Sequence, residues 1–120
     1  MAKILIVDDD VLITSLMQSL VSIDRHDPII VNDSTEALEV AKATSPDLIT
    51  LDLMMPNLNG YELCGILRAE PRFASTPIII ISAKEDTQSR DRAFSLGATE
   101  YLTKPFNIDE FLQAIKRLLR

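Results

Sequence analysis

The sequence predicts an α/β fold in which a five-stranded parallel sheet is covered by helices on both faces. Five short apolar runs alternate with stretches of helical periodicity along the whole chain. The runs read as continuous Val, Ile and Leu, which is typical of strands buried on both faces. Each connection is long enough for one helix, so right-handed crossovers between parallel strands are expected.

The five apolar runs give the expected strands. Each is four or five residues long and is bounded by polar or turn-forming residues, as strands usually are. The expected strands are Lys3–Val7, Pro28–Val31, Leu48–Leu51, Pro77–Ile81 and Glu100–Thr103.

One helix is expected in each gap. The first, near Val11–Ile23, is predicted to bury a stripe of apolar residues at helical spacing. The fourth, near Thr87–Leu96, is more polar, and Gly97 is well placed to end it. The predicted stripe of the first helix is Leu12, Leu16, Leu20 and Ile23.

The other three helices carry a start signal, a polar residue with glutamate three positions later, which is the spacing of a capping box. The second helix is expected near Ser34–Ala43, and the fifth is predicted to bury Ile108, Phe111, Leu112, Ile115 and Leu119. The three signals are Asp33 with Glu36, Asn59 with Glu62, and Asn107 with Glu110.

Composition limits the class of protein. A chain of 120 residues is expected to form one domain, residues 1–120, and its 47% hydrophobic and 25% charged residues are ordinary for a soluble globular protein. No apolar run approaches the roughly 20 residues that span a bilayer, and the first residues do not read as a signal peptide. Cys64 is the only cysteine, which suits a reducing compartment, so a cytoplasmic protein is expected.

The net charge argues against one class of partner. Twelve basic and eighteen acidic residues give a charge of −6. Proteins that hold nucleic acid through phosphate contacts are normally basic. Direct nucleic-acid binding by this chain is therefore not expected.

Polar residues follow four of the predicted strands. Because the carboxyl ends of parallel strands share one edge of the sheet, where ligands bind such folds, these side chains are expected to meet. Taken singly, each has a plainer explanation: a helix cap, a turn, a strand-end hydroxyl or a surface charge. The coincidence of complementary groups on one edge favours a site. The residues are Asp8, Asp9, Asp52, Ser82 and Lys104.

The clustered carboxylates predict a magnesium site. Mg²⁺ prefers oxygen ligands and binds through one or two carboxylates together with phosphate. Asp9 and Asp52 are candidate direct ligands, Asp8 is a candidate holder of a coordinated water, and the backbone carbonyl of Met54 can add an oxygen. Packed carboxylates repel one another unless a cation lies among them. Asp10 is better interpreted as a helix cap.

The same edge of the sheet suits phosphoryl transfer. Asp52 can attack phosphorus and form an aspartyl phosphate. Lys104 can neutralise charge on the phosphoryl oxygens, and Ser82 can donate a hydrogen bond to them. Ala83 is small and leaves room for the group.

These residues together resemble the receiver domain of two-component response regulators, and the chemotaxis regulators in particular. The resemblance runs over essentially the whole chain. Any one segment is weak, but all occur in order at the family's spacing. The segments are Asp8-Asp9, Leu51 to Pro56 followed by Asn59-Gly60, Ser82-Ala83, and Lys104-Pro105-Phe106.

The resemblance implies a flavodoxin-like, doubly wound fold with strand order 2-1-3-4-5 and five helices. It implies that Asp52 accepts a phosphoryl group from a phosphohistidine on a sensor kinase or phosphotransfer protein, with Mg²⁺, or Mn²⁺ in its place. Ser82 matches the family's hydroxyl switch residue, and Tyr101 matches the aromatic residue that turns inward after it. Lys104 matches the family's lysine, and its bond to Pro105 is expected to be cis.

The resemblance also implies an output. The surface built from the fourth helix, fifth strand and fifth helix would report phosphorylation to a downstream effector protein or domain, or to a second copy of the chain in a homodimer. Such a protein phosphorylates and dephosphorylates itself but has no metabolic substrate.

Three other functions are disfavoured. A magnesium-dependent phosphatase with an aspartyl nucleophile usually has an acidic residue where this chain has Met54, and it needs a cap domain. A receiver that only binds is disfavoured because every chemical group is present. A flavin-binding protein of this fold is disfavoured because there is no Trp and Tyr61 and Tyr101 are the only tyrosines.

Overall fold

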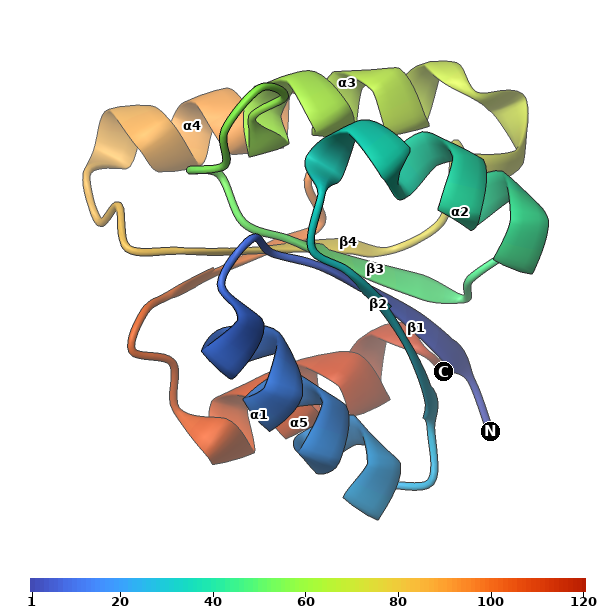
Figure 1. The fold of residues 1–120 in the computed structure, drawn as a ribbon. Helices are drawn as coiled ribbons and strands as arrows, with labels where there is room; N and C mark the ends of the chain where they lie inside the picture. Colours follow the sequence, from blue (N-terminus) through green and yellow to red (C-terminus); the bar gives the residue numbers. More distant parts are fainter.

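Five parallel strands form one sheet in the order β2-β1-β3-β4-β5 in the computed structural model, which describes residues 1–120 (Figure 1). The predicted fold class and strand order are confirmed. Three boundaries differ by one residue from those predicted: β2 begins at Asp27, and β4 begins at Ile78 and ends at Ser82. The strands are β1 (Lys3–Val7), β2 (Asp27–Val31), β3 (Leu48–Leu51), β4 (Ile78–Ser82) and β5 (Glu100–Thr103).

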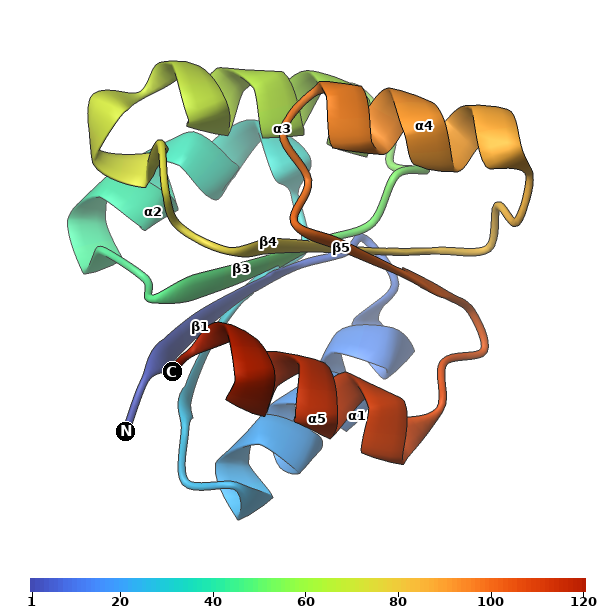
Figure 2. The ribbon, with the colours of Figure 1, turned by 180° about the vertical axis from the view of Figure 1, so that it is seen from behind.

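The helices form two layers, with α2, α3 and α4 on one face of the sheet and α1 and α5 on the other (Figures 1 and 2). Each layer closes its own buried cluster against the sheet, one of 18 residues and one of 11. No helix is both long and apolar enough to cross a membrane. The helices are α1 (Val11–Ile23), α2 (Ala37–Thr44), α3 (Gly60–Ala69), α4 (Thr87–Ser95) and α5 (Ile108–Leu118), with 3₁₀ turns η1 (Ser34–Glu36) and η2 (Pro71–Phe73).

The helix starts follow the predicted caps, with one change. Only the Asn59–Glu62 pair forms both hydrogen bonds of a capping box, at the start of α3. Asn107 accepts a bond from the Glu110 amide and caps α5. Asp33 instead caps η1, through the Thr35 amide, so the second helical segment starts as a 3₁₀ turn. Gly97 ends α4 with a φ of 108°, a conformation that favours glycine.

The predicted buried stripe of α1 is wrong except at Leu20, which packs against the buried cluster. Leu12 and Ile23 are 82% and 76% exposed, while Met17 and Val21 are buried against the sheet. The helix has apolar residues on two neighbouring stripes, and the sequence alone does not tell which one faces the sheet. In α5 the expected face is correct except at its first residue, Ile108, which is exposed.

The register of the central strands positions the carboxylates. Val7 pairs with Leu51 across β1 and β3. The residues that follow, Asp8 and Asp52, therefore leave the sheet side by side. On the other side of β3, Ser82 pairs with Thr103, which places Lys104 at the same edge.

Candidate functional site

Three aspartates come together at the carboxyl edge of the sheet. Asp8 and Asp9 follow β1, and Asp52 follows β3. One carboxylate oxygen from each lies within 4.8 Å of the others. Asp8 and Asp52 are 3% and 6% exposed, whereas Asp9 is open to solvent. The expected meeting of these side chains is thus observed.

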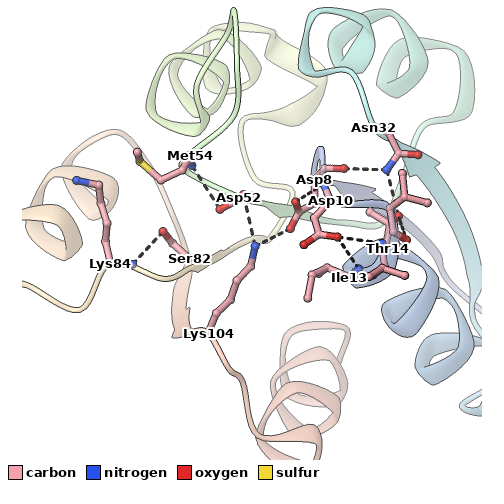
Figure 3. Close-up of polar contacts among 12 residues, drawn as sticks. Asp8, Asp10, Ile13, Thr14, Asn32, Asp52, Met54, Ser82, Lys84 and Lys104 are labelled. Atoms are coloured by element: carbon pink, nitrogen blue, oxygen red, sulfur yellow. Dashed lines mark hydrogen bonds and ion pairs between the residues drawn. The ribbon is translucent and has the colours of Figure 1, made fainter.

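Lys104 reaches into the carboxylate cluster from the end of β5 (Figure 3). Its Nζ donates a hydrogen bond to Asp8 Oδ2 at 2.8 Å and lies 3.4 Å from Asp52 Oδ2. The peptide bond between Lys104 and Pro105 is cis, as the resemblance implied. One ammonium group therefore contacts two buried carboxylates.

The proximity of these charges changes their protonation. Burial raises the pKa of Asp52, the neighbouring charge of Asp8 raises it further, and Lys104 only partly offsets both, so the pKa is about 6. For Lys104, burial disfavours the ammonium, but the hydrogen bond to Asp8 and the charge of Asp52 outweigh it and raise its pKa. A site that raises a carboxyl pKa in this way is short of positive charge.

The side chains expected to form the switch lie next to this cluster. Ser82 is fully buried at the end of β4, and its Oγ accepts a hydrogen bond from the Lys84 amide at 3.3 Å. The Met54 amide donates to Asp52 Oδ1 at 3.4 Å, while the Met54 side chain is 58% exposed (Figure 3). The Tyr101 ring is buried, and its hydroxyl donates to the Lys84 carbonyl at 2.8 Å.

Asp10 does not join the carboxylate cluster of Asp8 and Asp9 but caps the helix that follows. Its Oδ1 accepts hydrogen bonds from the amides of Leu12 and Ile13 at the start of α1. The interpretation of Asp10 as a helix cap is confirmed.

One supporting residue was not predicted. Asn32 follows β2, and its Nδ2 donates to the Asp8 carbonyl at 2.8 Å and to Thr14 Oγ1 at 3.1 Å (Figure 3). The edge strand is thereby fastened to the backbone that carries the cluster. The signal was present in the sequence, because Asn32 is another polar residue directly after a strand.

Gly60 lies at the start of α3, against the backbone of Asp52 and Leu53. Its amide donates to the Leu53 carbonyl at 3.0 Å. A Cβ at this position would overlap the Asp52 carbonyl oxygen and lie 2.7 Å from the Leu53 Cα. Only glycine therefore allows α3 to begin this close to the loop that bears Asp52.

The residues present fit a hard divalent cation. The donors are carboxylate oxygens, which Mg²⁺ prefers, and at least one of them is accessible from solvent through Asp9. A cation here would also relieve the repulsion that raises the Asp52 pKa.

The geometry agrees with a comparison of the whole sequence with known families. The family model of the response regulator receiver domain matches residues 4–116. The chain belongs to the response regulator receiver family. Receiver domains of this family are signalling switches in two-component systems and not metabolic enzymes.

Relatives of this receiver domain include transcriptional regulators. It is 41% identical over 120 residues to the response regulator ArlR of Staphylococcus saprophyticus and 37% identical over 120 residues to the DNA-binding dual master transcriptional regulator RpaA of Synechocystis. These alignments cover all of this chain but 53% and 50% of the relatives. The chain thus spans about half the length of these relatives.

Solved structures show the same receiver fold. The receiver domain of the Francisella response regulator 1452 is 34% identical, with a TM-score of 0.92 over 99% of this chain and 97% of that one. The chemotaxis protein CheY4 of Vibrio cholerae is 29% identical, with a TM-score of 0.94 over 99% of both chains.

Proposed function

We propose that this receiver domain, residues 1–120, is a switch in a two-component phosphorelay and that Asp52 is its phosphoacceptor. The observation that carries the proposal is the position of Asp52, a nearly buried carboxylate beside two others and 3.4 Å from the Lys104 ammonium. Its phosphoryl donor is a phosphohistidine on a sensor kinase or a phosphotransfer protein.

The proposed reaction transfers one phosphoryl group. An Asp52 carboxylate oxygen forms a bond to phosphorus, and the bond from phosphorus to the donor's imidazole nitrogen breaks, with its electron pair staying on the imidazole. Lys104 balances charge on the phosphoryl oxygens, and the Ser82 hydroxyl donates a hydrogen bond to one of them. Hydrolysis of the aspartyl phosphate later restores the carboxylate.

The metal in this proposal is Mg²⁺, or Mn²⁺ in its place. Asp9 and Asp52 would bind it directly, Asp8 through a water, and Met54 through its backbone carbonyl. A bound divalent ion supplies positive charge next to the phosphoryl oxygens. Asp8 would then exchange part of its contact with Lys104 for the metal's hydration shell.

The proposed output is a change in the α4-β5-α5 surface. A phosphoryl group on Asp52 adds about one to two negative charges and strong hydrogen-bond acceptors. Ser82 and Lys104 lie at the starts of the loops that lead to α4 and α5, so movement of either shifts those helices. A downstream effector, or a second copy of the chain, reads the change.

The proposed setting is the cytoplasm, with proteins as the partners. The charge of −6 does not suit direct binding to nucleic acid by these residues. The response regulator ArlR and the regulator RpaA are both relatives of this chain, and the name of RpaA describes it as a transcriptional regulator. A transcriptional output is therefore one form that the downstream effector can take.

The test is labelling with ³²P-acetyl phosphate and Mg²⁺. We expect an alkali-labile label on the native protein, none without the metal, and none on Asp52→Asn. Asp10→Asn is the matched control, because it changes a neighbouring aspartate that only caps α1 and should leave labelling intact. Mg²⁺-dependent labelling of Asp52→Asn at another residue would overturn the assignment. Repeated turnover of small phosphate esters would indicate a phosphatase instead.

A further inference from the structure

The Tyr101 ring is enclosed by two side chains of α4. The Arg90 guanidinium carbon lies 4.8 Å from the ring centroid, and the Phe94 ring lies 6.4 Å away at an interplanar angle of 44°. Arg90 and Phe94 are four residues apart, so they lie on the same side of the helix, one turn from each other. The far end of the ring is fixed by the hydroxyl bond to the Lys84 carbonyl. Tyr101 is thus held at its hydroxyl and over its ring.

Arg90 has no carboxylate partner. None of the ion pairs within 4.0 Å includes it, although the chain carries an excess of acidic residues. Its most direct interaction is with the Tyr101 ring. An arginine over a tyrosine face is attracted by the electron-rich ring, and no carboxylate within 4.0 Å competes for this guanidinium.

Phe94 completes the enclosure and is itself half exposed, at 42%. Its ring covers apolar surface of Tyr101 that solvent would otherwise reach. If Tyr101 turned outward, it would lose the guanidinium contact, the Phe94 contact and the bond to Lys84 together. All three contacts therefore favour the buried ring.

We propose that Arg90 and Phe94 form a clamp that keeps Tyr101 buried before any phosphoryl group arrives, so that Arg90 is a positioning residue that sets the resting state of the switch. The inference rests on the proposed function, together with the inward-turning role that the resemblance to receiver domains implies for Tyr101. It goes beyond that function by assigning the resting position of the aromatic residue to this chain's own α4 side chains. The surface around β5 is then partly in its signalling form without phosphorylation.

The effect of the clamp on the position of Tyr101 is large enough to measure. A cation–π contact at an exposed site is worth enough to change the ratio of buried to outward Tyr101 by about two- to five-fold. Phosphorylation would then add to a population that is already substantial. Without the clamp, a smaller fraction of Tyr101 should be buried before phosphorylation, and phosphorylation should change that fraction more.

The chain offers a clean probe, because Tyr61 and Tyr101 are its only tyrosines. Incorporation of 3-fluorotyrosine gives two ¹⁹F NMR signals, which the Tyr61→Phe variant assigns. Spectra are recorded for the free protein and with Mg²⁺ and beryllofluoride, a phosphoryl mimic. In the native protein we expect the Tyr101 signal to move little on adding the mimic.

In Arg90→Met we expect the Tyr101 signal of the free protein to shift toward that of a solvent-exposed fluorotyrosine, and the mimic to shift it back. Phe94→Ala should act in the same direction. Arg92→Met is the matched control, because the Arg92 guanidinium lies 4.0 Å from the Tyr61 centroid and its loss should move only the Tyr61 signal.

Two failures are distinguishable. If the mimic changes the spectrum but Arg90→Met and Phe94→Ala both leave the free Tyr101 signal at its native position, the clamp is refuted and the switch stands. If the mimic changes no signal in any of the proteins and leaves Asp52 unoccupied, the proposed function itself is refuted.

Discussion

Replacement of Asp52 by asparagine should stabilise the protein above pH 6. The pKa of Asp52 is about 6 in the folded protein, against 3.8 for an unperturbed carboxyl. The folded state therefore keeps a proton that the unfolded state has lost, and native stability falls as the pH rises from about 4 to about 6. Above pH 6 the Asp52 carboxyl is ionised in both the folded and the unfolded state, and the whole loss of unfolding free energy remains. Asparagine carries no charge and lacks this dependence.

The magnitude follows from the same pKa values. A pKa difference of about 2 corresponds to at most about 3 kcal/mol, since one pKa unit is ~1.4 kcal/mol. The asparagine amide stays buried and loses the attraction of Lys104, so the expected gain in unfolding free energy at pH 7.5 is about 1 to 3 kcal/mol. The gain should vanish near pH 4, where both proteins carry a neutral side chain.

Urea unfolding at pH 4, 5, 6 and 7.5, followed by circular dichroism, measures this difference. The carboxyl groups outside the site are common to both proteins, so their titration cancels in the comparison. Mg²⁺ should stabilise the native protein and have little effect on the variant. Parallel stability profiles of the two proteins from pH 4 to 7.5 would refute the reasoning.

Three further predictions concern stability at neutral pH, each checked by urea unfolding. Gly60→Ala should cost more than about 2 kcal/mol through overlap with the Asp52 carbonyl, whereas Gly65→Ala, which meets no atom within 4 Å, should gain up to about 1 kcal/mol; equal effects would contradict the close approach at Gly60. Lys104→Ala should destabilise the native protein by roughly 3 kcal/mol by leaving buried carboxylates unpaired, and saturating Mg²⁺ should recover much of the loss. Asn107→Ala should cost about 1 kcal/mol because the Glu110 amide loses its cap, and an unchanged midpoint would argue against that cap.

The sequence predicted the sheet and the polar edge well because both depend on local, strongly patterned signals. Continuous apolar runs fix buried strands, and each polar residue after such a run must appear at the same edge. The meeting of Asp8, Asp52 and Lys104 at one edge could therefore be predicted from the sequence alone. Their distances, and the sharing of one ammonium by two carboxylates, depend on side-chain packing that no spacing reveals.

The face of α1 shows where sequence patterns fail. Leu12 and Leu16 have helical spacing as good as that of Met17 and Val21, so periodicity cannot choose between the two stripes. Contact with the sheet decides it, and Met17 and Val21 belong to the buried cluster while Leu12 is exposed.

Arg68 shows a second limit. Arg68 donates to the carbonyls of Phe73, Thr76 and Gly97, three residues that follow it at unrelated spacings. Long-range hydrogen bonds of this kind, between side chain and backbone, leave no periodic trace in a sequence. The gathering of the site's side chains was thus easier to predict than the scaffold that supports them.

The sheet separates the two buried clusters, and this separation has a consequence for recognition. Tyr101 packs in the cluster on the α4 side, whereas Phe111 of α5 and Met17 of α1 pack in the other. We therefore expect a rearrangement around Tyr101 to reach α4 first. We expect a partner that binds only α1 to contact the same surface before and after phosphorylation. A partner that binds α4 should distinguish the two states. One small domain can in this way offer a constant face to one partner and a variable face to another.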